Sequence, residues 1–175
     1  MGEVARAADR DGETGGPATL VLAPGVSTEG AAACADRLAT KDVALVVAFR
    51  RQPDDWRAAR GDQLPPTWFV STDPHSDSVR AVADPGDLTG VGIAVSEFLG
   101  WLPSNARPGV CVDSLTTLLQ YSDTQRTARF LQVLFGRVLA ADGTVHCHAD
   151  PEAHDDAVLD QLATLFDDTI VLDSE

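Results

Sequence analysis

A short apolar run that ends in a carboxylate and a hydroxyl is the feature that most constrains the fold of this chain. Within residues 107–121, RPGVCVDSLTTLLQY, the segment from Gly109 to Val112 is apolar and follows a proline. Such a run is long enough for a buried strand and too short for a helix. Because it ends at Asp113 and Ser114, it predicts a polar pair at the carboxyl edge of a parallel sheet, where open α/β folds bind their ligands.

Segments with strand character and segments with helix character alternate along the rest of the chain. Apolar, β-branched runs predict strands at residues 18–22, 43–49, 67–71, 79–82, 144–148 and 169–172. Apolar periodicity and capping residues predict helices at residues 29–39, 54–59, 88–102 and 124–141, and a further one that begins at Pro151. Residues 115–121 predict a helical turn or a loop. The alternation predicts an α/β fold with a doubly wound, mostly parallel sheet of five to six core strands and helices on both faces.

Length and charge narrow the class of protein. The 175 residues predict one domain, residues 18–175. An acidic tail, residues 1–17, precedes it, and the composition of this tail predicts disorder.

The formal net charge is -14, and Lys41 is the single lysine among 13 basic residues. Without a basic stripe the chain is not expected to bind nucleic acid. Such an acidic, lysine-poor surface suits a halophilic cytoplasm, where molar salt screens self-repulsion.

Neither a membrane location nor a disulfide framework is expected. The N-terminal residues contain no apolar leader, and no apolar run of about 18 residues occurs, so we predict a cytoplasmic protein without a membrane partner. Cys34, Cys111 and Cys147 are odd in number, form no CxxC motif and lie among apolar or small residues. They are interpreted as reduced thiols of the core.

Several motifs together resemble the RecA/KaiC branch of the P-loop ATPases, and more specifically a group of short haloarchaeal KaiC-like proteins. The segments that carry this resemblance are Leu22-Ala23-Pro24, residues 53–56 (PDDW), Asp84 to Leu99, Val110 to Tyr121, and His146 to Asp155. They extend over about residues 20–172. The resemblance implies a RecA-like three-layer sandwich in which Asp113 and Ser114 stand at the Walker B position. It also implies self-association.

The phosphate loop that this resemblance implies is degenerate. A working loop reads GxxxxGK[ST] after the first strand, and its lysine balances the charge of the phosphates. The matching segment here is residues 23–30, APGVSTEG, with Glu29 in place of the lysine. A carboxylate about 4 Å from a phosphate charge repels it by about 4 kcal/mol at an effective dielectric of 20. ATP and Mg²⁺ are therefore disfavoured, and no cofactor is expected. The residues of this degenerate loop are Ala23, Gly25, Ser27, Thr28, Glu29 and Gly30.

Asp113 and Ser114 allow two interpretations. In the first, the two residues are the remnant of a site that bound a metal and a phosphate. In the second, Asp113 caps the turn that follows. The degenerate phosphate loop favours the second interpretation. No second carboxylate that could orient an attacking water is identified. No catalytic residue is therefore assigned.

The segment His146-Cys147-His148-Ala149-Asp150 is the other constellation that could carry chemistry. On a strand His146 and His148 face the same side, and Asp150 and His154 follow closely, so these four residues could converge on Zn²⁺. The alternative is that Asp150 caps the helix beginning at Pro151 and that the histidines pack or hydrogen-bond at the strand end. This alternative is favoured, because a metal site needs further ligands and supporting contacts.

The leading hypothesis is a non-catalytic RecA/KaiC-like domain, a pseudo-ATPase, that acts in cytoplasmic signalling or regulation. It would work through contacts with a protein partner or with copies of itself. Two alternatives remain open. One is a nucleotide-binding protein or ATPase with an atypical phosphate loop, and the other is a metal-binding regulatory module built on the histidine cluster.

Overall fold

A seven-stranded, all-parallel sheet forms the middle layer of an α/β sandwich. The computed structural model describes residues 16–24, 29–73 and 79–172. The strand order is β4-β3-β2-β5-β6-β1-β7. The sheet exceeds the expected five to six strands because the short β4 pairs with β3 at one edge and β7 pairs with β1 at the other. The strands are β1 (Ala18–Leu22), β2 (Val43–Ala48), β3 (Thr67–Ser71), β4 (Val79–Ala81), β5 (Pro108–Asp113), β6 (Thr144–Ala149) and β7 (Asp168–Val171).

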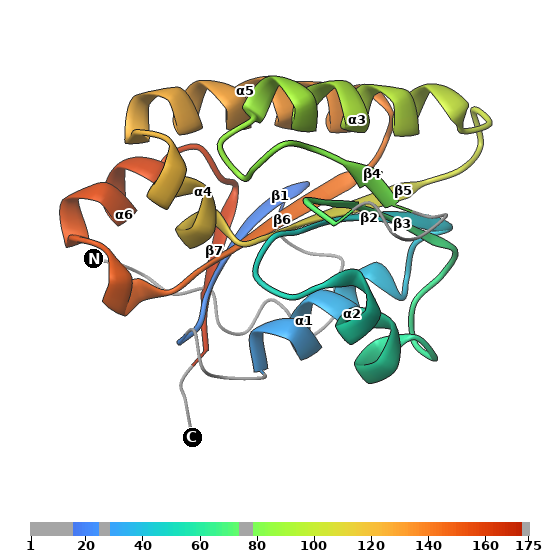
Figure 1. The fold of residues 1–175 in the computed structure, drawn as a ribbon, viewed down its shortest axis with the longest axis horizontal. Coiled ribbons are helices and arrows are strands. Elements are labelled where there is room, and N and C mark those ends of the chain that lie inside the picture. The colour runs from blue at the N-terminus through green and yellow to red at the C-terminus, as the bar shows by residue number, and fades with distance from the viewer. Residues whose placement is uncertain (1–15, 25–28, 74–78, 173–175) are drawn as a thin grey trace.

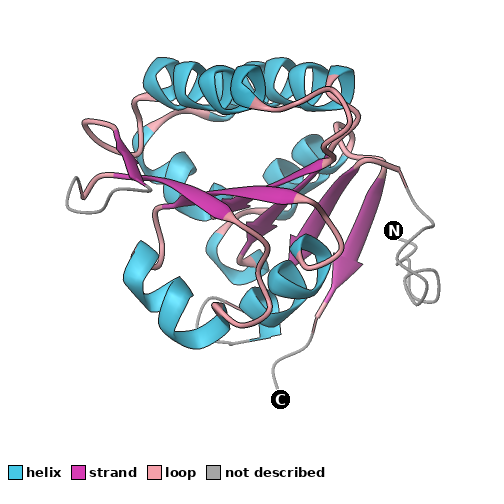
Figure 2. Cartoon of the chain, turned by 90° about the vertical axis from the view of Figure 1, so that its right-hand side faces the viewer, coloured by secondary structure: helices cyan, strands magenta, loops and turns pink. Residues whose placement is uncertain are grey.

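Helices cover both faces of this sheet, as the alternation of segments predicted. Figure 1 shows α3 and α5 side by side over one face and α1 and α2 beneath the other, and the turned view in Figure 2 shows the same three layers. None of the helices in the described ranges is long and apolar enough to cross a membrane. The helices are α1 (Glu29–Leu38), α2 (Pro53–Arg60), α3 (Leu88–Trp101), α4 (Leu115–Tyr121), α5 (Thr124–Ala140), the 3₁₀ turn η2 (Pro151–Ala153) and α6 (Asp156–Ala163).

The two faces of the sheet enclose two separate hydrophobic cores. Successive side chains of a strand point to opposite faces, so each central strand supplies both cores. The larger core lies under α3, α4, α5 and α6, and the smaller lies under α1 and α2. Trp56 of α2 is 1% exposed in the smaller core. Cys34 and Cys111 belong to the smaller core and Cys147 to the larger one.

Carboxylate caps begin two of the helices on the larger-core side. Asp87 accepts a hydrogen bond from the Gly90 N–H at 2.9 Å, and Asp123 accepts one from the Arg126 N–H at 2.7 Å. A side-chain oxygen at this position satisfies one of the N–H groups that the first turn leaves unpaired. Residues 115–121, expected as a helical turn or a loop, form the seven-residue helix α4.

The path of the chain through the sheet creates a switch point between β2 and β5. After β2 the chain proceeds outward to β3 and β4, and it then returns to β5, which pairs with the other side of β2. In doubly wound sheets the ligand crevice lies at the carboxyl ends of the strands where the order reverses. Arg50 follows β2 and Asp113 ends β5, so both residues lie at this point.

Candidate functional site

Asp113 is held in place at the end of β5 by Arg50. The Arg50 Nε donates a hydrogen bond to Asp113 Oδ1 at 2.8 Å, in an ion pair whose carboxylate side chain is 1% exposed. The backbone N–H groups of Phe49 and Arg50 both donate to the Asp113 carbonyl at 2.9 Å. The second carboxylate oxygen, Oδ2, is buried and has no hydrogen-bond partner among the described residues. The end of β5 is therefore fixed to the segment after β2 by three hydrogen bonds.

The helix after β5 is capped by Ser114 and not by Asp113. Ser114 Oγ accepts a hydrogen bond from the Thr117 N–H at 3.3 Å, at the N-terminus of α4. The peptide bond between Asp113 and Ser114 is cis. The interpretation of Asp113 as the cap of the following turn is wrong, because its carboxylate contacts the guanidinium of Arg50 instead.

The degenerate phosphate loop is only partly described. Gly25, Ser27 and Thr28 lie outside the described residues, as does the side chain of Glu29. Gly30 is buried in the first turn of α1. A Cβ atom added to Gly30 would lie 3.2 Å from His148 Nδ1, closer than most real Cβ contacts, so the absence of a side chain here leaves room for the imidazole.

A cavity of about 210 Å³ opens at the carboxyl edge of the sheet beside these residues. It reaches from the start of α1 to α4 and to the end of β6. Its volume is below the range of about 300–1,000 Å³ that is usual for small-molecule sites. Residues that line it include Gly30, Arg50, Ser114, Thr116, His148 and Asp150.

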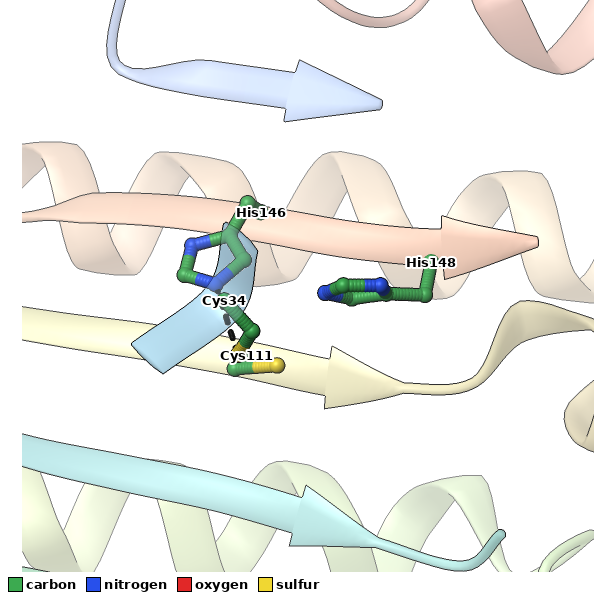
Figure 3. Close-up of side chains that lie close together, drawn as sticks. All are labelled: Cys34, Cys111, His146 and His148. Carbon is green, nitrogen blue, oxygen red and sulfur yellow. Dashed lines mark hydrogen bonds between the residues drawn. The ribbon is translucent and has the colours of Figure 1, made fainter. Parts of the chain in front are cut away.

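Beneath this cavity four buried side chains form a cluster that we call the Cys/His cluster: Cys34, Cys111, His146 and His148. Cys111 of β5 stands opposite His146 of β6 in the strand register, and His148 follows two residues later on the same face. Cys34 comes from α1, which covers that face (Figure 3). One ligand atom from each residue lies within 4.8 Å of the other three. Three elements far apart in the sequence thus meet at one point.

Close contacts hold the cluster together. His146 Nε2 and Cys34 Sγ are hydrogen-bonded at 2.9 Å. The rings of His146 and His148 pack edge to face, with centroids 5.6 Å apart. His148 is 4% exposed, yet neither of its ring nitrogens has a hydrogen-bond partner among the described residues. A buried polar group without a partner is costly, so His148 needs an explanation.

Burial sets the protonation of the cluster. It lowers the pKa of His148 to about 4, against the opposing effect of the Asp113 charge, and it lowers the pKa of His146 well below its usual value. It also raises the pKa of the Cys34 thiol and raises that of Cys111 well above its usual value. At neutral pH the cluster therefore holds two neutral imidazoles and two protonated thiols.

Asp150 and His154, the other two residues of the predicted zinc set, make different contacts. Asp150 Oδ1 accepts a hydrogen bond from the Glu152 N–H at 2.9 Å and caps η2, as the alternative interpretation predicted for the start at Pro151. The helix expected from Pro151 is only a 3₁₀ turn there, and the α-helix α6 begins at Asp156. His154 Nε2 is hydrogen-bonded to Thr116 Oγ1 at 2.9 Å. The same hydroxyl accepts a hydrogen bond from the Asp150 N–H. The structure thus brings His146 and His148 together with two cysteines, and not with Asp150 and His154.

Sequence reasoning missed Cys34 and Cys111 as members of the site. One signal was available for Cys111, which lies two residues before Asp113 on the same strand and so shares a face with it. Its position opposite His146 follows only from the order and register of the strands. Cys34 carried no local signal, because nothing in its surroundings indicates which strand α1 covers.

Together the fold and the site define a doubly wound α/β domain with an ion-paired aspartate at its switch point and a buried Cys/His cluster next to it. The chain belongs to a family of unknown function (DUF7504), whose sequence pattern matches residues 16–172. No curated protein matches this chain.

Proposed function

We propose that this chain is a non-catalytic RecA/KaiC-like domain that acts in cytoplasmic signalling or regulation through contacts with other protein molecules. The observation that carries the proposal is the ion pair between Arg50 and Asp113. Two features of the sequence also support the proposal. Residues 20–172 resemble that superfamily, and the acidic residue Glu29 occupies the lysine position of the phosphate loop.

The ion pair argues against a working Mg²⁺ site. A Walker B aspartate needs a free carboxylate that faces the metal and its waters. In this chain Oδ1 of Asp113 already accepts from a guanidinium at 2.8 Å. A divalent ion about 4 Å from that guanidinium would be repelled by about 8 kcal/mol at an effective dielectric of 20, which offsets the attraction of the carboxylate. Mg-ATP would have to displace Arg50 to bind as it does in an active enzyme.

Exposed apolar side chains on the outer helices support a role in protein contacts. Trp101 of α3 is 66% exposed and Val133 of α5 is 54% exposed. Ile93 and Leu139, on the same two helices, are also exposed. These four residues lie on two helices that pack against each other, and an exposed tryptophan is the residue type among them that is enriched in interaction surfaces.

Calorimetric titration of Mg-ATP tests the loss of nucleotide binding. We expect no heat of binding for the wild type in molar KCl up to millimolar ATP. The variant Glu29→Lys, which restores the lysine, is expected to gain binding. Turnover of ATP by the wild type, abolished in Asp113→Asn, would contradict the proposal.

Photo-crosslinking tests the role in protein contacts. A crosslinking residue at position 101 or 133 is expected to form covalent adducts with another protein molecule in extracts of the native host. The same residue at Asp62, exposed beyond α2 on the other side of the sheet, serves as the control. Equal adduct formation at all three positions would count against a defined interaction surface.

A second candidate function is binding of a nucleotide or a smaller anion in the cavity. The observation that favours it is the presence of Arg50 in the lining of the cavity, together with the hydroxyl-bearing Ser114 and Thr116. Stoichiometric ATP binding that disappears in Arg50→Met would support this candidate over the first.

A further inference from the structure

The arrangement of the Cys/His cluster matches the donor set of a closed metal site. Two thiols and two imidazoles are the ligands of structural Zn²⁺ sites, which are almost always four-coordinate and tetrahedral. Cys34, Cys111, His146 and His148 are all buried, and each offers one donor atom to the same small volume. Figure 3 shows both imidazoles extending from β6 towards the sulfurs.

The distances between the donor atoms are close to those of a filled site. With Zn–S bonds of about 2.3 Å and Zn–N bonds of about 2.0–2.1 Å, the edges of the tetrahedron are about 3.3–3.8 Å. The donor atoms of the cluster lie within 4.8 Å of one another, so the longest separation would contract by about 1 Å. The 2.9 Å contact between His146 Nε2 and Cys34 Sγ would lengthen by about 0.6 Å. Side-chain rotations accommodate changes of this size.

His148 supplies an independent reason to expect a ligand at this point. Its ring is buried, and neither nitrogen has a hydrogen-bond partner among the described residues. A metal ion would accept the lone pair of one nitrogen. A Cβ atom on Gly30 would lie 3.2 Å from Nδ1 of the same ring, so the glycine leaves space beside the imidazole. Of the four cluster residues, His148 is the one that also lines the cavity at the carboxyl edge of the sheet.

We propose that Cys34, Cys111, His146 and His148 bind one Zn²⁺ ion in a tetrahedral, structural site. All four ligands come from the protein, so no position is left for a substrate or a reactive water. The ion would join α1 to β5 and β6 and fix the start of α1 beside the degenerate phosphate loop. Binding releases the two thiol protons, because a coordinated sulfur is a thiolate. This inference is independent of the proposed role in protein contacts.

Metal analysis and cobalt substitution test the site. The full chain is purified with a phosphine reductant in molar KCl, freed of metal by dialysis against a chelator, and then titrated with Zn²⁺ or Co²⁺. We expect one equivalent to bind. We also expect the Co²⁺ form to show the strong visible absorption of a tetrahedral site and the near-ultraviolet band of thiolate ligation. These spectra are recorded on the wild type, so the test does not depend on the folding of any variant.

Variants then locate the ion. Cys111→Ser and His148→Gln are expected to weaken binding by at least about tenfold, since removal of a ligand costs no less than removal of a supporting contact. Cys147→Ala is the matched control, because Cys147 is equally buried but lies on the other face of the sheet. It should bind Co²⁺ with an unchanged spectrum.

Several results would overturn the proposal. They are a wild type that binds no metal, a Co²⁺ spectrum without thiolate ligation, and a Cys147→Ala variant that loses as much affinity as Cys111→Ser. A disulfide between Cys34 and Cys111 in the protein isolated under anaerobic conditions, detected by mass spectrometry after thiol blocking, would also overturn it.

Discussion

Arg50 and Asp113 form an ion pair of 2.8 Å between the segment that follows β2 and the end of β5. The two strands are neighbours at the switch point of the sheet, where a doubly wound fold usually binds its ligand. The carboxylate is almost fully buried, and the backbone of the same residue accepts two further hydrogen bonds from Phe49 and Arg50. The residue at the Walker B position of the resemblance is therefore held by the protein's own side chains and backbone.

Removal of the guanidinium should leave a buried carboxylate without its partner. We expect Arg50→Met to lower the free energy of unfolding by about 1–3 kcal/mol, less than for a fully buried pair because the arginine side chain is 25% exposed. Chemical denaturation measures the change. Arg80→Met, which removes an exposed pair with Glu97, should change stability by less than about 0.5 kcal/mol. A second substitution, Asp113→Asn, should recover part of the loss from Arg50→Met. A loss no larger than in Arg80→Met would show that the pair does not stabilise the fold.

Thr116 connects α4 to the segment after β6 through its hydroxyl. The oxygen accepts a hydrogen bond from the Asp150 N–H and is hydrogen-bonded to His154. Thr116→Val keeps the shape but removes the hydroxyl, so the Asp150 N–H loses its acceptor, at an expected cost of about 1–3 kcal/mol. Thr116→Ser retains the oxygen and should lose less. Thermal unfolding of both variants compares them, and a loss in Thr116→Val no larger than that in Thr116→Ser would contradict a stabilising role for the hydroxyl.

Two glycines should respond to alanine in opposite directions. A Cβ on Gly109 of β5 would lie 2.8 Å from Lys41 Cγ and 2.9 Å from Leu38 Cδ2, so Gly109→Ala should destabilise by about 1–3 kcal/mol. A Cβ on Gly136, within α5, would meet nothing within 4 Å. Gly136→Ala should stabilise by about 0.5–1 kcal/mol, because alanine loses less backbone entropy in a helix. Denaturant midpoints measure both changes. A stable Gly109→Ala variant would contradict the expected clash and would mean that the side chains of Lys41 and Leu38 can move aside.

The caps of α5 and α6 differ in a way that stability can detect. Asp123 accepts a hydrogen bond from the Arg126 N–H, whereas Asp155 occupies the N-cap of α6 without a side-chain cap hydrogen bond. Asp123→Ala should therefore cost about 1 kcal/mol. Asp155→Ala, which removes the same charge near a helix start, should cost only the dipole contribution of about 0.3–1 kcal/mol at low salt and less in molar KCl. Denaturation at high salt separates the two, and equal effects there would argue against capping by Asp123.

Much of the fold was predictable because its signals are local. The continuous apolar run beginning at Val43 indicated a strand, and the apolar periodicity of residues 88–102 and 124–141 indicated two long helices. The alternation of strands and helices indicated a parallel sheet with two covered faces. The number of strands was harder to predict, because β4 has three residues, which are too few to show the alternation of a strand. The helical state of residues 115–121 depended on the Ser114 cap, which the sequence did not distinguish from Asp113.

What the sequence determined by itself is therefore most of the strands and helices, the two-sided burial of the sheet and the shared face of His146 and His148. All of these follow from periodicity along one segment. Only the tertiary structure decided which of these side chains contact one another. The strand order brought Cys111 opposite His146, and the packing of α1 added Cys34 from more than a hundred residues away along the chain. The same strand order paired Asp113 with Arg50. Contacts between distant segments depend on register and on which face a helix covers, and neither property is encoded in the local pattern of residues.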